Sequence, residues 1–154
     1  MFPIEEVFIL NFKIRKAAPE DVDALKQLNY EFNNVIVTND NIVEGIKKGD
    51  EIIVVATVNN SPIAFACAKI TKSICYNYKD AEITEVFVRD NYRKQGIAKS
   101  MIKFIEDIFE ENKANHIGIL TGTKNFAAQD LYKDCGYNLK EKVMMVKYLH
   151  EKEH

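Results

Sequence analysis

The stretch that decides the fold is Ala81-Glu82-Ile83-Thr84-Glu85-Val86-Phe87-Val88-Arg89-Asp90-Asn91-Tyr92-Arg93-Lys94-Gln95-Gly96-Ile97-Ala98. Its first half is rich in β-branched and aromatic residues, which predicts a strand over residues 81–89. A short polar loop follows, and the apolar positions after it repeat every 3.6 residues, which predicts a long helix over 96–113. A strand that leads through a short loop into a long helix is typical of folds that mix helices with a sheet.

The rest of the chain extends this pattern on both sides. Alternating or β-branched runs predict strands over 12–17, 51–58, 63–71, 117–120 and 143–149, with a short extra strand near 137–139. Helical spacing predicts a helix that begins at Pro19 and further helices over 41–48 and 126–134, with Gly49 ending the second helix. The order predicts an α/β (α+β) fold, a central mixed sheet with helices on both faces. We expect a single domain over 1–154, with its core at about 12–149.

Composition excludes several classes of protein. Lys plus Arg is 21 and Asp plus Glu is 23, so the net charge is −2, and a nucleic-acid partner is not expected. The three cysteines form no CxxC pair and the histidines are scattered, so no metal site is expected. Residues 1–10 lack the basic start of a signal peptide, and no apolar run approaches the roughly 18–20 residues of a spanning helix. We therefore expect a cytoplasmic protein with no membrane partner.

The loop before the long helix has the features of an anion site. The first turn of a helix offers unpaired N–H groups and a partial positive charge. Gly96 lets a phosphate approach the backbone, Ala98 keeps the next turn clear, and Arg93 and Lys94 add positive charge. These residues predict a site for a diphosphate held mainly by main-chain N–H groups.

Two motifs resemble one known family. Arg93-x-x-Gly96-x-Ala98 is similar to the Gln/Arg-x-x-Gly-x-Gly/Ala pyrophosphate loop of the GNAT superfamily of N-acetyltransferases. Further along, Asn125-Phe126-Ala127-Ala128-Gln129-Asp130-Leu131-Tyr132-Lys133-Asp134-Cys135-Gly136-Tyr137 resembles the second family signature, Asn-x-x-Ala-x-x-Leu-Tyr-x-x-x-Gly-Phe/Tyr. The motifs stand in the family's order, and the resemblance covers roughly residues 12–149.

The resemblance implies acetyl-CoA as the acetyl donor and no metal. By analogy with the family, the strand before the loop separates from the next strand, and pantetheine pairs with the main chain at Val86, Phe87 and Val88. The pyrophosphate lies on the loop and the first helical turn, and Asn125 contacts the cofactor. The expected loop residues are Arg93, Lys94, Gln95, Gly96, Ile97, Ala98 and Lys99. The sequence leaves open whether the protein forms a homodimer, as family members often do through the C-terminal strand.

Acetyl transfer to an amine requires a neutral amine, donors for the oxyanion and a proton for the departing thiolate. Tyr132 matches the family's tyrosine that faces the CoA sulfur, so it is the candidate acid; the alternative is a core aromatic. Glu82 and Glu85 are both candidate bases, with Glu85 slightly preferred. They lie three residues apart, so an unbroken strand places them on opposite faces, whereas a bulge would change this.

The expected substrate is a small-molecule primary amine. The segment from Leu131 to Met145 and the Gln95–Ala98 loop look like the aminoglycoside 3-N-acetyltransferase branch, which favours a small polyamine or aminosugar. The acids Glu31, Asp40, Glu44, Glu82 and Glu85 could form an acidic mouth for a polycation, or be scattered solvated charges. A peptide or protein amine is an alternative acceptor. A non-catalytic acyl-CoA-binding sensor is the alternative outside catalysis, although the presence of Gly96 and Tyr132 argues for an enzyme.

Overall fold

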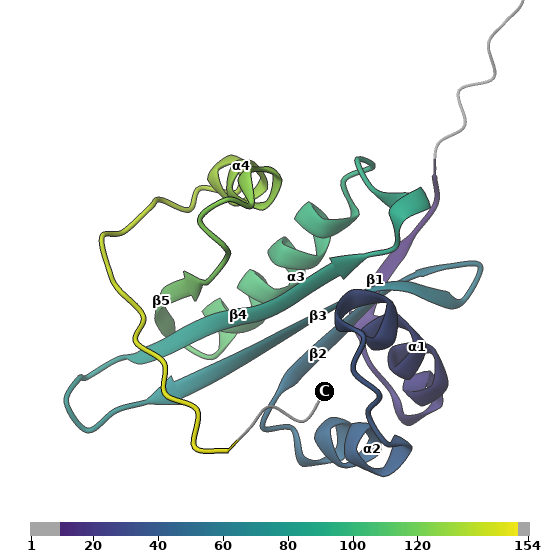
Figure 1. Ribbon diagram of the computed structural model, residues 1–154, viewed down its shortest axis with the longest axis horizontal. Helices are drawn as coiled ribbons and strands as arrows, with labels where there is room; N and C mark the ends of the chain where they lie inside the picture. Colours follow the sequence, from purple (N-terminus) through teal and green to yellow (C-terminus); the bar gives the residue numbers. More distant parts are fainter. Residues whose placement is uncertain (1–9, 151–154) are drawn as a thin grey trace, which may run out of the picture. The chain divides into compact units, whose positions relative to one another are not determined.

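The computed structural model describes residues 10–150 (Figure 1). Residues 1–10, for which we expect no signal peptide, lie almost wholly outside the described residues. The chain divides into two compact units, residues 1–120 and residues 121–154, which are described separately. No helix among the described residues is both long enough and apolar enough to cross a bilayer.

The first unit contains a five-stranded sheet in the order β1-β2-β3-β4-β5. The first four strands pair antiparallel and β5 runs parallel to β4, which confirms the predicted mixed sheet. A parallel neighbour requires a crossover, and the helix α3 provides it. The strands are β1 (Lys13–Lys16), β2 (Ile52–Val58), β3 (Ser61–Lys72), β4 (Lys79–Val88) and β5 (Ala114–Ile119).

Three helices of the first unit cover both faces of this sheet. They are α1 (Val22–Asn33), α2 (Asn39–Lys48) and α3 (Ile97–Glu111). A short 3-10 turn, η1 (Pro19–Asp21), precedes α1, so the α-helix itself begins three residues after the expected Pro19. Thr38 caps α2 through the Asn41 N–H at 3.2 Å, and Gly49 ends α2 at φ 68°, as predicted.

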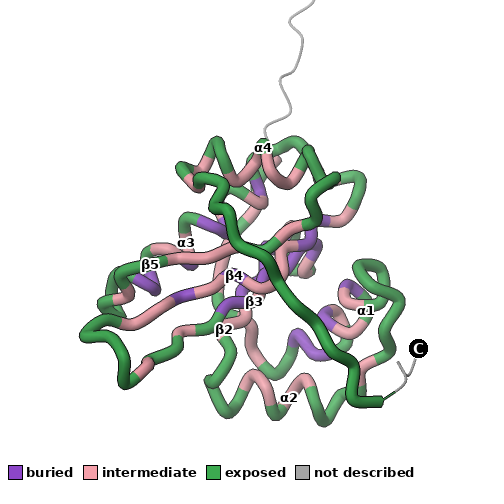
Figure 2. The backbone as a smooth tube through the Cα atoms, turned by 60° about the vertical axis from the view of Figure 1, so that its left-hand side comes forward, coloured by how far each residue is buried: buried purple, intermediate pink, exposed green. Residues whose placement is uncertain are grey.

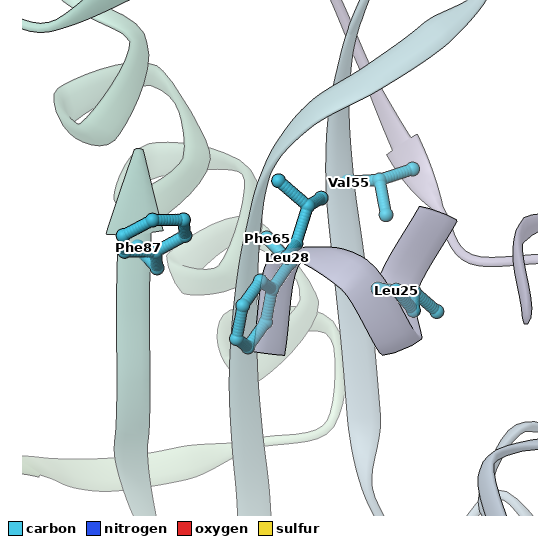
Figure 3. Packing of buried hydrophobic residues seen from close by; sticks show 5 residues of the cluster. All are labelled: Leu25, Leu28, Val55, Phe65 and Phe87. Carbon is cyan, nitrogen blue, oxygen red and sulfur yellow. The ribbon is translucent and has the colours of Figure 1, made fainter. Parts of the chain in front are cut away.

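The core on one face of the sheet joins α1 to three strands. Leu25 and Leu28 of α1 point toward Val55, Phe65 and Phe87, which are cross-strand neighbours on β2, β3 and β4 (Figure 3). Residues that alternate with these three point to the other face, where α3 contacts β2, β3 and β4. The buried side of α3 includes Ile97, Met101, Ile102, Ile105 and Phe109, so both faces exclude water.

A one-residue bulge interrupts β4. Cys67 pairs with Glu85, but the next residue of β3, Ala68, pairs with Ile83, which leaves Thr84 as the extra residue. The Thr84 hydroxyl lies 3.1 Å from the main-chain oxygen of Cys67. Side chains alternate between the two faces along a regular strand. One extra residue therefore moves every later side chain to the face opposite the one that regular alternation would give it.

The second unit contains α4 (Phe126–Asp134), and here two predicted strands are absent. Residues 143–149 form no strand, and neither do residues 137–139. The apolar side chains at 143–149 are 61% to 92% exposed, and Figure 2 draws the segment after α4 mostly as exposed. β-Branched residues favour a strand only where a neighbouring strand supplies hydrogen bonds, and the described residues give this segment no such partner.

Candidate active site

The loop that connects β4 to α3 has the backbone geometry of an anion site. It contains the 3-10 turn η2 (Asp90–Tyr92), and both Lys94 and Gly96 have positive φ, 60° and 80°. The helix begins at Ile97, and the Ser100 N–H bonds the Gly96 oxygen at 3.0 Å. The N–H groups before Ser100 have no helical acceptor four residues back.

Gly96 also leaves open space beside this helix start. A Cβ added there would meet no heavy atom within 4 Å. The glycine is therefore required by its backbone conformation rather than by a protein neighbour. The open space fits a close approach of phosphate oxygens to the first turn of α3.

Arg93 has a different position from the one expected of a free cation. Its Nε donates to the Val88 oxygen at 2.8 Å, its Nη1 pairs with Asp90 at 2.7 Å, and its guanidinium lies 5.8 Å from the centre of the Phe87 ring. These contacts hold the loop against the end of β4. The charge of Arg93 is thus partly compensated within the loop, and Lys94 and Lys99 are the other basic residues there.

The two parallel strands stop pairing before β4 ends. The last pair between β4 and β5 is Ile83 with Ile119. Beyond that point, Val86, Phe87 and Val88 pair only with β3. The β5 side of this part of β4 therefore has main-chain groups that no strand satisfies among the described residues.

The bulge brings both candidate bases to one face of the sheet. Glu82 lies opposite Lys69 and Glu85 opposite Cys67, and these two β3 residues share a face because they are two positions apart. Glu82 forms an ion pair with Lys69 at 3.1 Å. Glu85 instead accepts a hydrogen bond from the hydroxyl of its neighbour Thr84. The two carboxylates thus differ in environment, although they share a face.

Glu85 lines a pocket of about 230 Å³ between the α1–α2 segment and the sheet. Glu51, immediately before β2, lies on the same pocket wall, and oxygens of Glu51 and Glu85 lie within 4.8 Å of each other and of the Cys67 sulfur. Glu82 does not line this pocket. The complete lining is Leu25, Asn29, Asn33, Val37, Asn41, Ile42, Gly45, Glu51, Ile53, Phe65, Cys67 and Glu85.

The pocket keeps Cys67 in its thiol form. Burial raises the pKa of Cys67 above its ordinary value, and the charges of Glu51 and Glu85 and a hydrogen bond to Glu51 raise this pKa further. A thiol with a raised pKa is a poor nucleophile and a poor metal ligand. Cys67 therefore acts here as a donor to Glu51.

Two asparagines fix the α1 wall of the pocket. The Asn33 Nδ2 donates to the Asn29 Oδ1 at 3.1 Å, and the Val35 N–H donates to the Asn33 Oδ1 at 2.9 Å. Asn29 also donates from Nδ2 to the Val35 oxygen at 3.2 Å. These bonds hold the chain that leaves α1, where Asn34 has a positive φ of 59°.

Four of the five acids considered for an acidic mouth lie outside the pocket lining, which favours the alternative of scattered charges for them. Glu31 pairs with Arg89 at 2.9 Å, and this contact lowers the pKa of Glu31. Glu44 pairs with Lys48 and Glu82 with Lys69. Of the five acids in that hypothesis, Glu85 alone lines the pocket. Glu51, which the charge pattern did not single out, takes the place of the others.

In the second unit, Asn125 immediately precedes α4 and Tyr132 lies within it. Asn125 is the N-cap, and its side-chain oxygen accepts from the Ala128 N–H at 3.2 Å. The Tyr132 ring packs edge-on against Tyr137, with the ring centres 6.4 Å apart. Partial burial raises the pKa of Tyr132, so its phenol carries a proton at neutral pH.

Comparison with known proteins identifies the family. The chain matches the acetyltransferase (GNAT) family over residues 17–137. No curated protein matches it significantly. Three solved structures share the fold at low sequence identity, which supports the fold alone.

The first is an aminoglycoside acetyltransferase, meta-AAC0020, from an uncultured soil metagenomic sample: TM-score 0.80, 19% identity, covering 91% of this chain and 97% of that one. The second is a transcriptional regulator from Bacillus halodurans C-125: TM-score 0.79, 17% identity, coverages of 90% and 100%. The third is a ribosomal-protein-alanine N-acetyltransferase from Brucella melitensis biovar Abortus 2308: TM-score 0.76, 13% identity, coverages of 89% and 99%.

The chain belongs to the GNAT acetyltransferase family. It is an acetyltransferase of the acetyl-CoA-dependent type that this family defines, and the mixed sheet with helices on both faces is the family fold.

Proposed function

We propose that this enzyme transfers the acetyl group of acetyl-CoA directly to a primary amine, and that the amine belongs to a small polyamine or an aminosugar. The observation that carries the proposal is the position of Glu85. The bulge at Thr84 turns this carboxylate into a pocket, on the same strand that leads to the Gly96 loop. A proton acceptor and an anion site thus lie at successive points of one strand–loop–helix segment.

The donor site is proposed at the carboxyl end of β4. The N–H groups of Lys94, Gln95, Gly96, Ile97, Ala98 and Lys99 would hold the pyrophosphate, since the first turn of a helix offers unpaired donors and a positive dipole end. Val86, Phe87 and Val88 would bind pantetheine through main-chain groups on the side that β5 leaves unpaired. Arg93 supports this arrangement by fixing the loop to the Val88 oxygen.

The acceptor amine arrives as an ammonium, which has no lone pair and must lose a proton before it attacks. Glu85 is the proposed base, directly or through a water, because Glu82 is already paired with Lys69 and lies outside the pocket lining. The main-chain N–H of Val86 or Val88 is the proposed donor to the oxyanion. When bound, acetyl-CoA supplies an activated thioester carbonyl.

Tyr132 is the proposed acid. A phenol with a raised pKa keeps its proton at neutral pH and can donate to a departing thiolate. Asn125 is proposed to contact the cofactor from the start of α4, in addition to its role as the helix cap. The aminoglycoside acetyltransferase of the same fold supports testing aminosugars among the first acceptors.

The test is acetyl-CoA turnover, followed by thiol release, against polyamines, aminoglycosides, amino acids and basic peptides. Binding of acetyl-CoA is measured in parallel by calorimetry. We expect turnover with a polyamine or an aminoglycoside. Turnover confined to peptides would replace the acceptor class, binding without turnover on any amine would favour an acyl-CoA sensor, and no binding would contradict the donor site.

A further inference from the structure

The pocket beside Glu85 contains a second carboxylate to which the proposed reaction assigns no role. Glu51 precedes β2, and one of its oxygens lies within 4.8 Å of an oxygen of Glu85. Among residues 10–150, no Lys or Arg nitrogen lies within 4.0 Å of either carboxylate. Glu31, Glu44 and Glu82, by contrast, each have a basic partner.

Two uncompensated carboxylates in one pocket repel each other, and a bound cation relieves that repulsion. The protein donors to these two carboxylates are neutral: the Cys67 thiol bonds Glu51, and the Thr84 hydroxyl bonds Glu85. A metal ion would require the thiolate at this position, whereas the raised pKa of Cys67 holds the proton on sulfur. The chemistry of the pocket therefore favours an organic cation over a metal.

The spacing of the carboxylates fits one ammonium group. A charge-assisted N–H···O bond is about 2.8 Å long. Two acceptors bonded to the same tetrahedral nitrogen are then about 4.6 Å apart, by simple geometry on that bond length. The Glu51 and Glu85 oxygens lie within 4.8 Å of each other, so both can reach one ammonium nitrogen.

The remainder of the pocket fits the carbon skeleton of an amine. Leu25, Ile42, Ile53 and Phe65 supply apolar surface around the carboxylates. The α1 wall is held rigid by the Asn29, Asn33 and Val35 hydrogen bonds. The pocket therefore combines apolar surface with the amides of three asparagines and one pair of carboxylates, and the carboxylates are the groups that select a charged end of the ligand.

We infer that Glu51 is a specificity-determining residue, which with Glu85 holds the charged form of the acceptor's primary amino group between two carboxylates. This inference rests on the proposed function and goes further by assigning the recognition of the cation to Glu51 and its deprotonation to Glu85. An unhindered primary ammonium suits the site best, since it has two hydrogens for the carboxylates and one more for a third acceptor. The two glutamates thus have different roles: loss of Glu51 weakens binding, and loss of Glu85 slows chemistry.

The test compares Glu51→Gln with the wild-type enzyme, using spermidine and sisomicin as the amines. Glu51→Gln should raise KM at least tenfold, change kcat less than threefold and leave acetyl-CoA affinity unchanged. Glu51→Asp should recover part of the lost affinity, because the charge is restored. Glu20→Gln, on the exposed first turn before α1, is the matched control and should behave like the wild type.

Direct binding separates this inference from the proposed reaction. Calorimetry with CoA-saturated enzyme should show each amine bound at least tenfold more weakly by Glu51→Gln than by the wild type. Equal affinity or equal KM in both enzymes would overturn the role of Glu51, while wild-type turnover would leave the proposed function standing. Failure of the wild type to bind either amine would overturn the amine site itself, even if acetyl-CoA still binds.

Discussion

Arg15 forms a two-point ion pair with Asp21, with Nη1 and Nη2 at 2.6 and 2.8 Å from the two carboxylate oxygens. The same carboxylate accepts the Ala18 N–H at 2.8 Å, and its side chain is only 5% exposed. The pair joins β1 to the 3-10 turn before α1 and so fixes the entry of the chain into the helix that forms one wall of the pocket.

Asp21→Asn should lower the free energy of unfolding by about 1–3 kcal/mol at pH 7, less than for a fully buried pair because Arg15 is half exposed. The hydrogen bond from Arg15 lowers the pKa of Asp21 below its ordinary 3.8. This contribution is therefore complete above that value and disappears as the pH falls through the lowered folded-state pKa. Urea unfolding at pH 7 and pH 3 should show the variant and the wild type converging at acid pH. Equal midpoints at pH 7 would contradict the assignment.

Gly96→Ala should weaken acetyl-CoA binding at least tenfold, because a Cβ would occupy the open space beside the first turn of α3. Gly49→Ala is the matched control: Gly49 also has a positive φ and no neighbour within 4 Å of an added Cβ, but it ends α2. Both variants should lose roughly 1 kcal/mol of stability from backbone strain. Calorimetry with acetyl-CoA should separate them, and equal affinities would argue against the loop as the pyrophosphate site.

Glu85→Gln should lower kcat about a hundredfold through loss of a general base, with acetyl-CoA affinity retained. Glu82→Gln is its natural control, since Glu82 is on the same face but paired with Lys69. It should keep kcat within a few-fold of the wild type. If Glu82→Gln loses more activity than Glu85→Gln in steady-state kinetics, the base has been assigned to the wrong carboxylate.

Tyr132→Phe should lower kcat roughly 10- to 100-fold and leave the fold and acetyl-CoA affinity intact, because only the proton-donating hydroxyl group is removed and the ring stays in place. Tyr137→Phe preserves the ring contact between the two tyrosines and should retain activity. Thermal unfolding provides the check on structure. Full activity of Tyr132→Phe would mean that the hydroxyl has no part in catalysis and that Tyr132 serves only to pack α4.

The β4–loop–α3 segment was predictable because each of its parts has a local signal. β-Branched residues mark the strand, Gly96 marks the left-handed turn, and a 3.6-residue period marks the helix. The prediction of a strand at 143–149 was wrong for the opposite reason. The composition of this segment favours a strand, but the presence of a neighbouring strand to pair with depends on the whole sheet.

The pocket was only partly predictable. Glu85 was found through the family resemblance, but Glu51 and Cys67 come together through the register of β2 with β3, which no local pattern contains. The period of two in β2 was the available signal, because it places Glu51 in phase with Ile53 and Val55. The contacts of Arg93 with Val88 and Asp90 depend on the loop's three-dimensional path, and the sequence indicated only its charge.

The extra residue at Thr84 makes β4 one residue longer than its pairing with β3 requires. Most single substitutions along this strand change one side chain and leave the others in place. Deletion of Thr84 would remove the bulge and make Ile83 and Glu85 successive residues opposite Ala68 and Cys67, so that both halves of β4 would keep their sheet faces. We expect a Thr84 deletion variant to keep the same buried side chains and to lose only the local geometry that the bulge gives to the neighbouring Glu85.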